Sequence, residues 1–153
     1  MSNKDEKKAE SERESFKRFA SANGWPTDTN LIESRKAPEP DILYHLPSGK
    51  IAFELAEYCD PDVALQAADP NSEDAKWVGG PPAKSLKKKL TRSYKSKFPL
   101  ELLFYWSGRV VETDDMAVPK LKHLFDNKFT GNKFRRVWYS GEKGVFQIFE
   151  ADS

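Results

Sequence analysis

Apolar and polar residues alternate on both sides of a Ser48–Gly49 dipeptide. A period of two is typical of a strand that buries one face, and a short polar break between two such runs predicts a β-hairpin. With Ser48–Gly49 as the loop, Leu43 pairs with Glu54 and Asp41 pairs with Ala56. This pairing places six apolar side chains on one face, which we expect to enter the core: Ile42, Tyr44, Leu46, Ile51, Phe53 and Leu55.

Apolar residues that recur every three or four positions predict three helices. The first begins near Glu12 and ends at Asn23–Gly24, where glycine suits a left-handed residue at the C-terminal end of a helix. The second covers residues 82–98 and is stopped by the proline that follows. The third is capped by Asp114 or Asp115, runs through Val118 to Phe125 and ends near Asn127.

Further strands complete the predicted order of elements. A short strand lies at Leu31–Ile32, a nearly all-apolar strand at residues 101–106 suits a sheet interior that is covered on both faces, and a second hairpin spans residues 134–149. Helices and strands in this order predict one α/β layered domain. We assign this domain to residues 12–153, after a charged and flexible leader at residues 1–11.

Composition narrows the class of protein. The chain has 153 residues, one cysteine and two histidines, which is too few for a Cys/His zinc site or a disulfide-stapled scaffold. The lone Cys59 suits a reducing compartment. The charged first residues do not resemble a secretory signal, and no segment approaches the ~20 apolar residues of a membrane span. We therefore expect a cytoplasmic protein with no membrane partner.

Basic side chains are concentrated in the predicted second helix. Residues 84–97 contain seven lysine and arginine residues and no acid, so that the rest of the chain has a net charge of −6. A basic surface attracts a phosphodiester backbone, although a solvated helix face has the same composition. Arg135 and Arg136 are candidates to extend this surface. The predicted nucleic-acid-binding residues of the helix are Lys84, Lys87, Lys88, Arg92 and Lys95.

Two acidic residues lie on the polar face of the first hairpin. The predicted register makes Asp41 and Glu54 diagonal neighbours, roughly 7–8 Å apart at the backbone, so that both carboxylates can reach one cation. Mg²⁺ needs only one or two protein carboxylates, because water and phosphate oxygens fill its other positions. Ala52 and Ala56 leave room beside them. The hairpin therefore predicts a divalent-metal site that is held by Asp41 and Glu54.

The same residues resemble a known family of nucleases. Pro40–Asp41, followed a dozen residues later by Glu54 at the end of an apolar strand, is similar to the motif of the PD-(D/E)xK nuclease superfamily. The resemblance covers roughly residues 12–106 and implies a restriction-endonuclease-like α/β fold, in which helices flank a mixed central sheet in three layers. The core of that fold runs helix, three-stranded meander, helix, strand. The resemblance also implies that the Asp and the Glu hold Mg²⁺ or Mn²⁺.

One position departs from the family pattern. The superfamily's lysine, which helps to orient or activate the attacking water, would stand two residues after Glu54, where this chain has Ala56. Lys88 on the following helix is the predicted surrogate. A glutamate of the first helix often joins the metal ligands in this family, and we assign this role to Glu14, with Glu12 as the alternative.

The resemblance implies a metal-dependent endonuclease, a hydrolase that cleaves phosphodiester bonds in nucleic acid, with DNA favoured over RNA. Two alternatives from other classes stay open. One is a nuclease-derived module that binds nucleic acid or protein without cleavage, which Ala56 favours. The other is a small interaction domain for a protein partner. The sequence also leaves open whether two copies pair as a homodimer to cut both strands.

Overall fold

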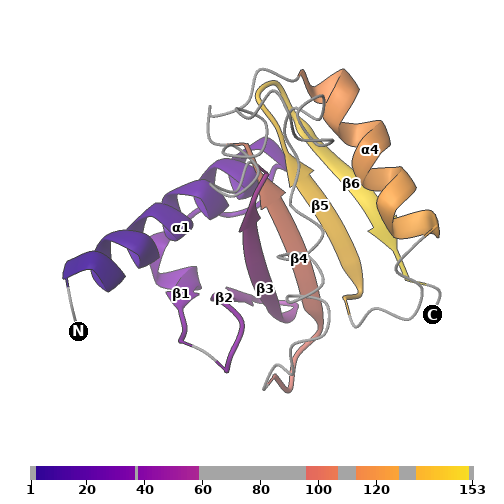
Figure 1. Ribbon diagram of the computed structural model, residues 1–153. Coiled ribbons are helices and arrows are strands. Elements are labelled where there is room, and N and C mark those ends of the chain that lie inside the picture. The colour runs from indigo at the N-terminus through magenta and orange to yellow at the C-terminus, as the bar shows by residue number, and fades with distance from the viewer. Residues whose placement is uncertain (1–2, 37, 59–95, 107–112, 128–133, 152–153) are drawn as a thin grey trace.

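The computed structural model describes residues 3–36, 38–58, 96–106, 113–127 and 134–151. In these residues the helices and strands follow one another as α1 (Asn3–Ala22), the 3₁₀ helix η1 (Thr29–Leu31), β1 (Ile32–Ser34), β2 (Ile42–Leu46), β3 (Gly49–Glu57), β4 (Leu100–Tyr105), α4 (Asp114–Asn127), β5 (Arg136–Ser140) and β6 (Val145–Glu150). The six strands form one sheet in sequence order (Figure 1). The predicted α/β class is confirmed.

The sheet is mixed. β1, β2 and β3 form an antiparallel meander, β4 and β5 run parallel to β3, and β6 returns antiparallel to β5. Parallel neighbours require a crossover connection, and α4 lies in the crossover between β4 and β5. The predicted C-terminal hairpin is confirmed as β5 and β6, and the predicted third helix is confirmed as α4.

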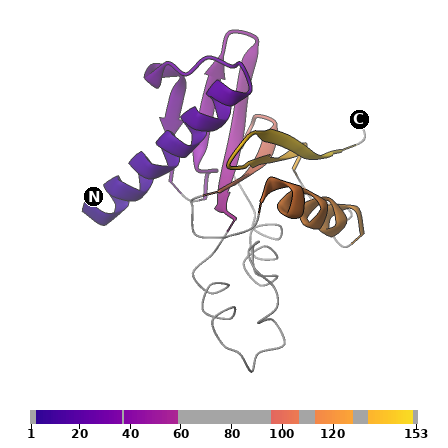
Figure 2. The same cartoon turned by 90° about the horizontal axis from the view of Figure 1, so that it is seen from above.

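The two described helices cover opposite faces of the sheet. Phe16 and Phe19 of α1 belong to one core cluster with Leu103 of β4, whereas Leu121 of α4 belongs to another cluster with Leu102 of β4. Neighbouring residues of a strand point to opposite faces, so the two clusters lie on the two sides of the sheet. Figures 1 and 2 show α1 against the meander end of the sheet and α4 against the β5–β6 end.

The first hairpin differs from its predicted register by two residues. Its loop is Pro47–Ser48, and β2 pairs with β3 from Leu46 opposite Gly49 to Ile42 opposite Phe53. Proline has no N–H for the ladder and its fixed φ suits the first position of a turn, so the loop begins one residue earlier than predicted. Gly49, the first residue after the turn, has a φ of 140° that other residues rarely adopt. Because the shift is even, every side chain keeps its predicted face.

α1 is longer than predicted. It begins at Asn3 rather than near Glu12, so that most of the predicted flexible leader is helical. Lys, Glu and Ala dominate these residues; they are good helix formers and extend a helix whose second half is anchored by packing. The helix ends as predicted at Gly24, which has a φ of 74°, and the Trp25 N–H donates to the Ala20 carbonyl at 2.8 Å.

Asp114 connects the start of α4 to the loop between β5 and β6. Its carboxylate accepts hydrogen bonds from the backbone N–H groups of Glu142 at 3.0 Å and Lys143 at 2.9 Å. The Thr113 carbonyl, one residue earlier, accepts two N–H groups of the first helical turn. Gly141 must lack a side chain, because a Cβ at this position would collide with the Asp114 carboxylate.

The predicted second helix lies almost wholly outside the described residues, which resume at Ser96. No helix in the described ranges is long and apolar enough to cross a membrane. The five basic residues to which we assigned nucleic-acid binding also lie outside these ranges: Lys84, Lys87, Lys88, Arg92 and Lys95.

Candidate functional site

The observed register places Asp41 directly opposite Glu54. Asp41 stands one step beyond the Ile42–Phe53 pair that ends the β2–β3 ladder. Two hydrogen bonds fix the carboxyl groups across the strands: the Asp41 N–H donates to Glu54 Oε1 at 3.2 Å, and the Leu55 N–H donates to Asp41 Oδ2 at 2.9 Å. The two-residue shift therefore brings the predicted pair closer together than the diagonal arrangement we expected.

Burial makes this pair of acids unusual. Glu54 is only 1% exposed and Asp41 is largely buried. Removal from water raises the pKa of Asp41 from 3.8 to about 8, and the negative charges of Glu54 and Glu12 contribute to this rise. A hydrogen bond between the Asp41 and Glu54 carboxyl groups raises the pKa further, whereas the Leu55 N–H lowers it. At neutral pH Asp41 therefore keeps a proton that an exposed aspartate would have released.

α1 contributes Glu12 to this site rather than Glu14. Glu12 is half-buried, and its charge raises the pKa of Asp41. Glu14 is exposed and pairs with Lys17 at 3.6 Å. A separation of two residues is about 200° of rotation around a helix, so the two glutamates point in nearly opposite directions. The structure thus does not bring Glu14, our predicted third acid, to the pair, whereas the charge of Glu12, the alternative, acts on Asp41.

Ala56 stands two residues after Glu54, where the motif that this hairpin resembles has a lysine. Ala56 follows Glu54 on the same face of β3 and is buried in the core cluster under α4. Lys50 shares this face but lies four residues from Glu54, about 13 Å along the strand. Its ammonium lies instead over the ring of Phe98, 5.3 Å from the centroid. Lys88, our predicted surrogate, lies outside the described residues.

The donor atoms of the pair suit a hard divalent cation. Carboxylate oxygens are the ligands that Mg²⁺ and Mn²⁺ prefer, and a cation can replace the proton that Asp41 keeps. Among the described residues, no group of three or more His, Cys, Asp or Glu side chains is close enough to hold a metal ion. The residues therefore fit a site with two protein ligands, in which water and substrate oxygens complete the coordination.

A second buried carboxylate, Glu101, lies on the sheet face that α1 covers. Glu101 is fully buried, and its Oε2 accepts hydrogen bonds from Arg135 Nε at 3.0 Å and Arg136 Nη1 at 3.3 Å. Its Oε1 accepts from Trp138 Nε1 at 2.6 Å. Both arginines were candidates to extend a basic surface, and the structure pairs them with this carboxylate. No sequence pattern marks the contact, because Glu101 and Arg135 are brought together by the pairing of β4 with β5.

A groove of about 440 Å³ opens next to the acid pair, and sequence analysis missed it. Its walls come from two segments that are far apart in the chain, and we expected Phe98 to be the last residue of the second predicted helix. The available signal was an aromatic residue directly after Lys97, at the end of the basic segment. The groove is lined by Arg35, Glu39, Pro40, Ile42, Leu43, Ala52, Ser96, Lys97 and Phe98.

An ion-pair network lies along the side of the groove that Arg35 and Glu39 line. Arg35 donates to Glu33 at 2.5 Å and to Glu39 at 2.6 Å, and His45 Nε2 lies 2.8 Å from the other Glu33 oxygen. Hydrogen bonds from His45 and Arg35 lower the pKa of Glu33. His45 therefore faces a carboxylate on β1 and not the Asp41–Glu54 pair.

Comparison with known proteins adds no family to this description: a scan against models of protein families, a search of curated proteins and a search of solved structures each found no match.

Proposed function

We propose that this chain is a metal-dependent endonuclease, a hydrolase that cleaves phosphodiester bonds in nucleic acid, with DNA favoured over RNA. The observation that carries the proposal is the position of Asp41 opposite Glu54 in a buried pair. Burial and the neighbouring charge of Glu54 raise the pKa of Asp41, and perturbed groups of this kind are typical of functional sites. A divalent cation resolves the repulsion between Asp41 and Glu54.

The order of the elements supports the proposal. The resemblance to the PD-(D/E)xK superfamily implies a helix, a three-stranded meander, a helix and a strand. α1, β1 to β3 and β4 follow this order, and β4 is parallel to β3, as an intervening crossover requires. We infer that the domain has the restriction-endonuclease-like three-layer core, with α1 and α4 on opposite faces of the mixed sheet.

Each residue of the site has a separate task in this proposal. Asp41 and Glu54 hold Mg²⁺ or Mn²⁺, and Glu12 adds negative charge to the same site. A metal ion, when bound, supplies polarisation of the phosphodiester and lowers the pKa of a bound water. The backbone N–H groups of Asp41 and Leu55 fix the two carboxylates, so that little reorganisation precedes binding. Phosphate contacts are assigned to Lys84, Lys87, Lys88, Arg92 and Lys95.

A second candidate is a nuclease-derived module that binds nucleic acid without cleavage. Ala56 favours it, because this residue occupies the position of the superfamily's lysine and packs in the core. Such a module would bind in a salt-sensitive manner through its basic residues and would not need Asp41.

A cleavage assay separates the two candidates. Supercoiled plasmid, single-stranded DNA and RNA are incubated with the wild-type chain and with Asp41→Asn and Glu54→Gln variants, in Mg²⁺ or Mn²⁺. We expect metal-dependent cleavage that falls about 100-fold or more in both variants, because each loses a metal ligand while it keeps its shape. Glu14→Gln is the matched control, since it neutralises an acid of α1 that the structure places in solvent.

Two outcomes contradict the nuclease proposal. Cleavage that persists in both variants would come from another source, such as a contaminating nuclease. Absence of cleavage by the wild-type chain, together with metal-independent binding of the same substrates, would favour the binding module.

A further inference from the structure

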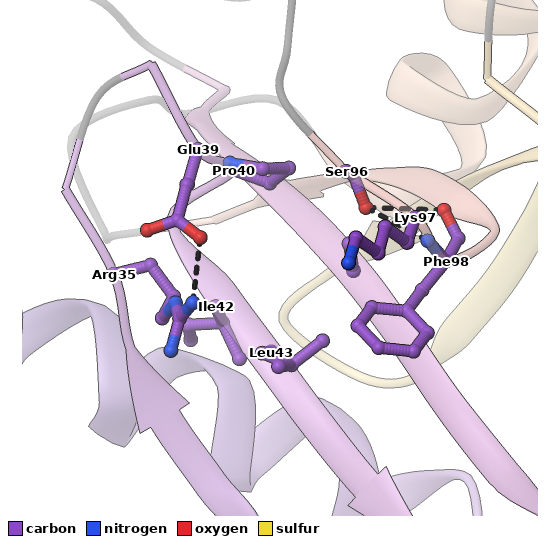
Figure 3. Close-up of a pocket in the computed structure, with 9 residues that line it drawn as sticks. Arg35, Glu39, Pro40, Ile42, Leu43, Ser96, Lys97 and Phe98 are labelled. Atoms are coloured by element: carbon purple, nitrogen blue, oxygen red, sulfur yellow. Dashed lines mark hydrogen bonds and ion pairs between the residues drawn. The ribbon is translucent and has the colours of Figure 1, made fainter.

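The groove beside the acid pair has an apolar floor that continues the site face of the sheet (Figure 3). Leu43 and Ala52 form the floor, and both are buried. They are paired across β2 and β3, and Asp41 and Glu54 lie two residues further along the two strands, on the same face. Residues i and i+2 of a strand lie about 7 Å apart, so a ligand in the groove reaches the acid pair along the same sheet face.

One wall of the groove combines an aromatic ring with positive charge. Phe98 is half-buried and Lys97 is exposed, and the Lys50 ammonium lies over the Phe98 ring. Among the described residues, no acid forms an ion pair with Lys97. An aromatic face next to an uncompensated cation is the arrangement that binds a nucleobase together with its phosphate.

The opposite wall carries balanced charge. Arg35 lies between Glu33 and Glu39 and forms an ion pair with each, at 2.5 and 2.6 Å. Figure 3 shows the Arg35–Glu39 pair across the floor from Phe98. Because its charge is compensated, this wall is poorly suited to a phosphate. It offers guanidinium donors and carboxylate acceptors, which are the groups that read the edges of bases.

We propose that the groove binds one unpaired nucleobase, stacked on Phe98 and facing the Arg35–Glu39 pair, with the adjoining phosphate at Lys97. A volume of about 440 Å³ is in the range of sites for ligands of nucleotide size. Bases in a duplex are stacked inside the helix, so a base reaches Phe98 only from a single strand or after it leaves the stack. This inference rests on the proposed function and names its substrate class, a nucleic-acid strand with unpaired bases.

The first experiment tests whether a base stacks on the Phe98 ring. It measures binding of a short, end-labelled single-stranded DNA oligonucleotide by fluorescence anisotropy in EDTA. We expect Phe98→Ala to weaken binding by about fivefold or more, and Phe98→Trp to retain it. Phe98→Leu keeps an apolar side chain of similar volume without the ring, and we expect it to weaken binding as Ala does. Affinity for the corresponding duplex should be lower than for the single strand.

Salt dependence of the same binding tests the phosphate contact. Lys97→Gln should reduce the slope of log affinity against log salt by about 0.7, the value for one phosphate contact to a single strand. Lys143→Gln is the matched control, because Lys143 is an exposed lysine in the loop between β5 and β6, at the other end of the sheet. We expect no change of slope in this control.

The two proposals fail in different ways, because binding is measured without metal and cleavage is measured separately. Unchanged affinity in Phe98→Ala and Phe98→Leu, or equal affinity for duplex and single strand, would overturn the base-binding groove. Weakened binding in these variants, without cleavage by the wild-type chain, would support the groove and count against the nuclease.

Discussion

Two buried carboxylate sites lie on opposite faces of one sheet, and the fold stabilises them in different ways. Glu101 receives hydrogen bonds from Arg135, Arg136 and Trp138. Asp41 receives one backbone N–H and faces a second carboxyl group, Glu54. In the described part of the chain, no lysine, arginine or histidine forms an ion pair with Asp41.

This difference separates a structural acid from a candidate ligand. A buried charge is tolerated when cations and hydrogen-bond donors from the same chain surround it, and such a charge has no capacity left for an external cation. Asp41 instead keeps a proton at neutral pH, which a metal ion can replace. The comparison predicts that removal of Glu101 weakens the fold, whereas neutralisation of Asp41 strengthens it.

The largest effect is expected for Glu101→Ala. The substitution leaves two arginines without their shared carboxylate and the Trp138 N–H without its acceptor, so we expect the free energy of unfolding to fall by about 3–5 kcal/mol. Urea denaturation measures this change. Glu150→Gln is the control, since Glu150 is an exposed partner of Arg136 at 3.6 Å and should contribute less than about 1 kcal/mol. Equal losses of unfolding free energy in Glu101→Ala and Glu150→Gln would show that the buried hydrogen bonds of Glu101 do not stabilise the fold.

Neutralisation of Asp41 is expected to increase the free energy of unfolding, by an amount that depends on pH. Between about pH 4 and pH 8, folded Asp41 keeps a proton that the unfolded chain has released, because its pKa is raised from 3.8 to about 8. The unfolded state then binds fewer protons, so the stability of the wild-type chain decreases as pH rises through this window. Asp41→Asn removes the titration and keeps an acceptor for the Leu55 N–H. We expect the variant to be more stable by about 2 kcal/mol near pH 8.

The difference between the variant and the wild-type chain isolates this group, because all other titrating groups are common to both. Denaturation at several pH values should give nearly equal stabilities below pH 4 and a widening difference above it. A constant difference over the whole range would contradict a raised pKa at Asp41.

The smallest expected change in stability comes from the two glutamates of α1, and its pH dependence distinguishes them. Glu12→Gln removes a negative charge that raises the pKa of Asp41, so we expect a stabilisation of about 0.5 kcal/mol at pH 8 that disappears below pH 4. Glu14→Gln loses only its ion pair with Lys17 and should be destabilised slightly, with little dependence on pH. The same denaturation series measures both. A pH-dependent gain in Glu14→Gln alone would restore Glu14 as the third acid.

Patterns with a short period predicted much of the fold. Alternation in the first hairpin assigned every side chain to its observed face, although the register was wrong by two residues, because an even shift preserves the faces. The error concerned Pro47, whose missing N–H determines where the loop begins. The existence of α4 and of the C-terminal hairpin followed from the same kind of pattern, although β5 begins at Arg136 rather than at Phe134.

Contacts between distant elements were not predictable in this way. The choice between Glu12 and Glu14 is an exception that helical periodicity could have made, because Glu12 precedes the buried Phe16 by four residues and so shares its face, whereas Glu14 does not. The pairing of Arg135 and Arg136 with Glu101 depends on the alignment of β4 with β5. The groove depends on how residues 35–43 face residues 96–98, and no local pattern encodes that approach.

In our proposal Asp41 and Glu54 form one divalent-cation site, and a titration with Mn²⁺ followed by electron paramagnetic resonance tests this claim. We predict one bound Mn²⁺ per wild-type chain and per Glu14→Gln chain at pH 7.5, and loss of this binding in the Asp41→Asn/Glu54→Gln double variant. Mg²⁺ should displace the bound Mn²⁺. Equal Mn²⁺ binding by the wild-type chain and the double variant, or no binding by the wild-type chain, would contradict the claim.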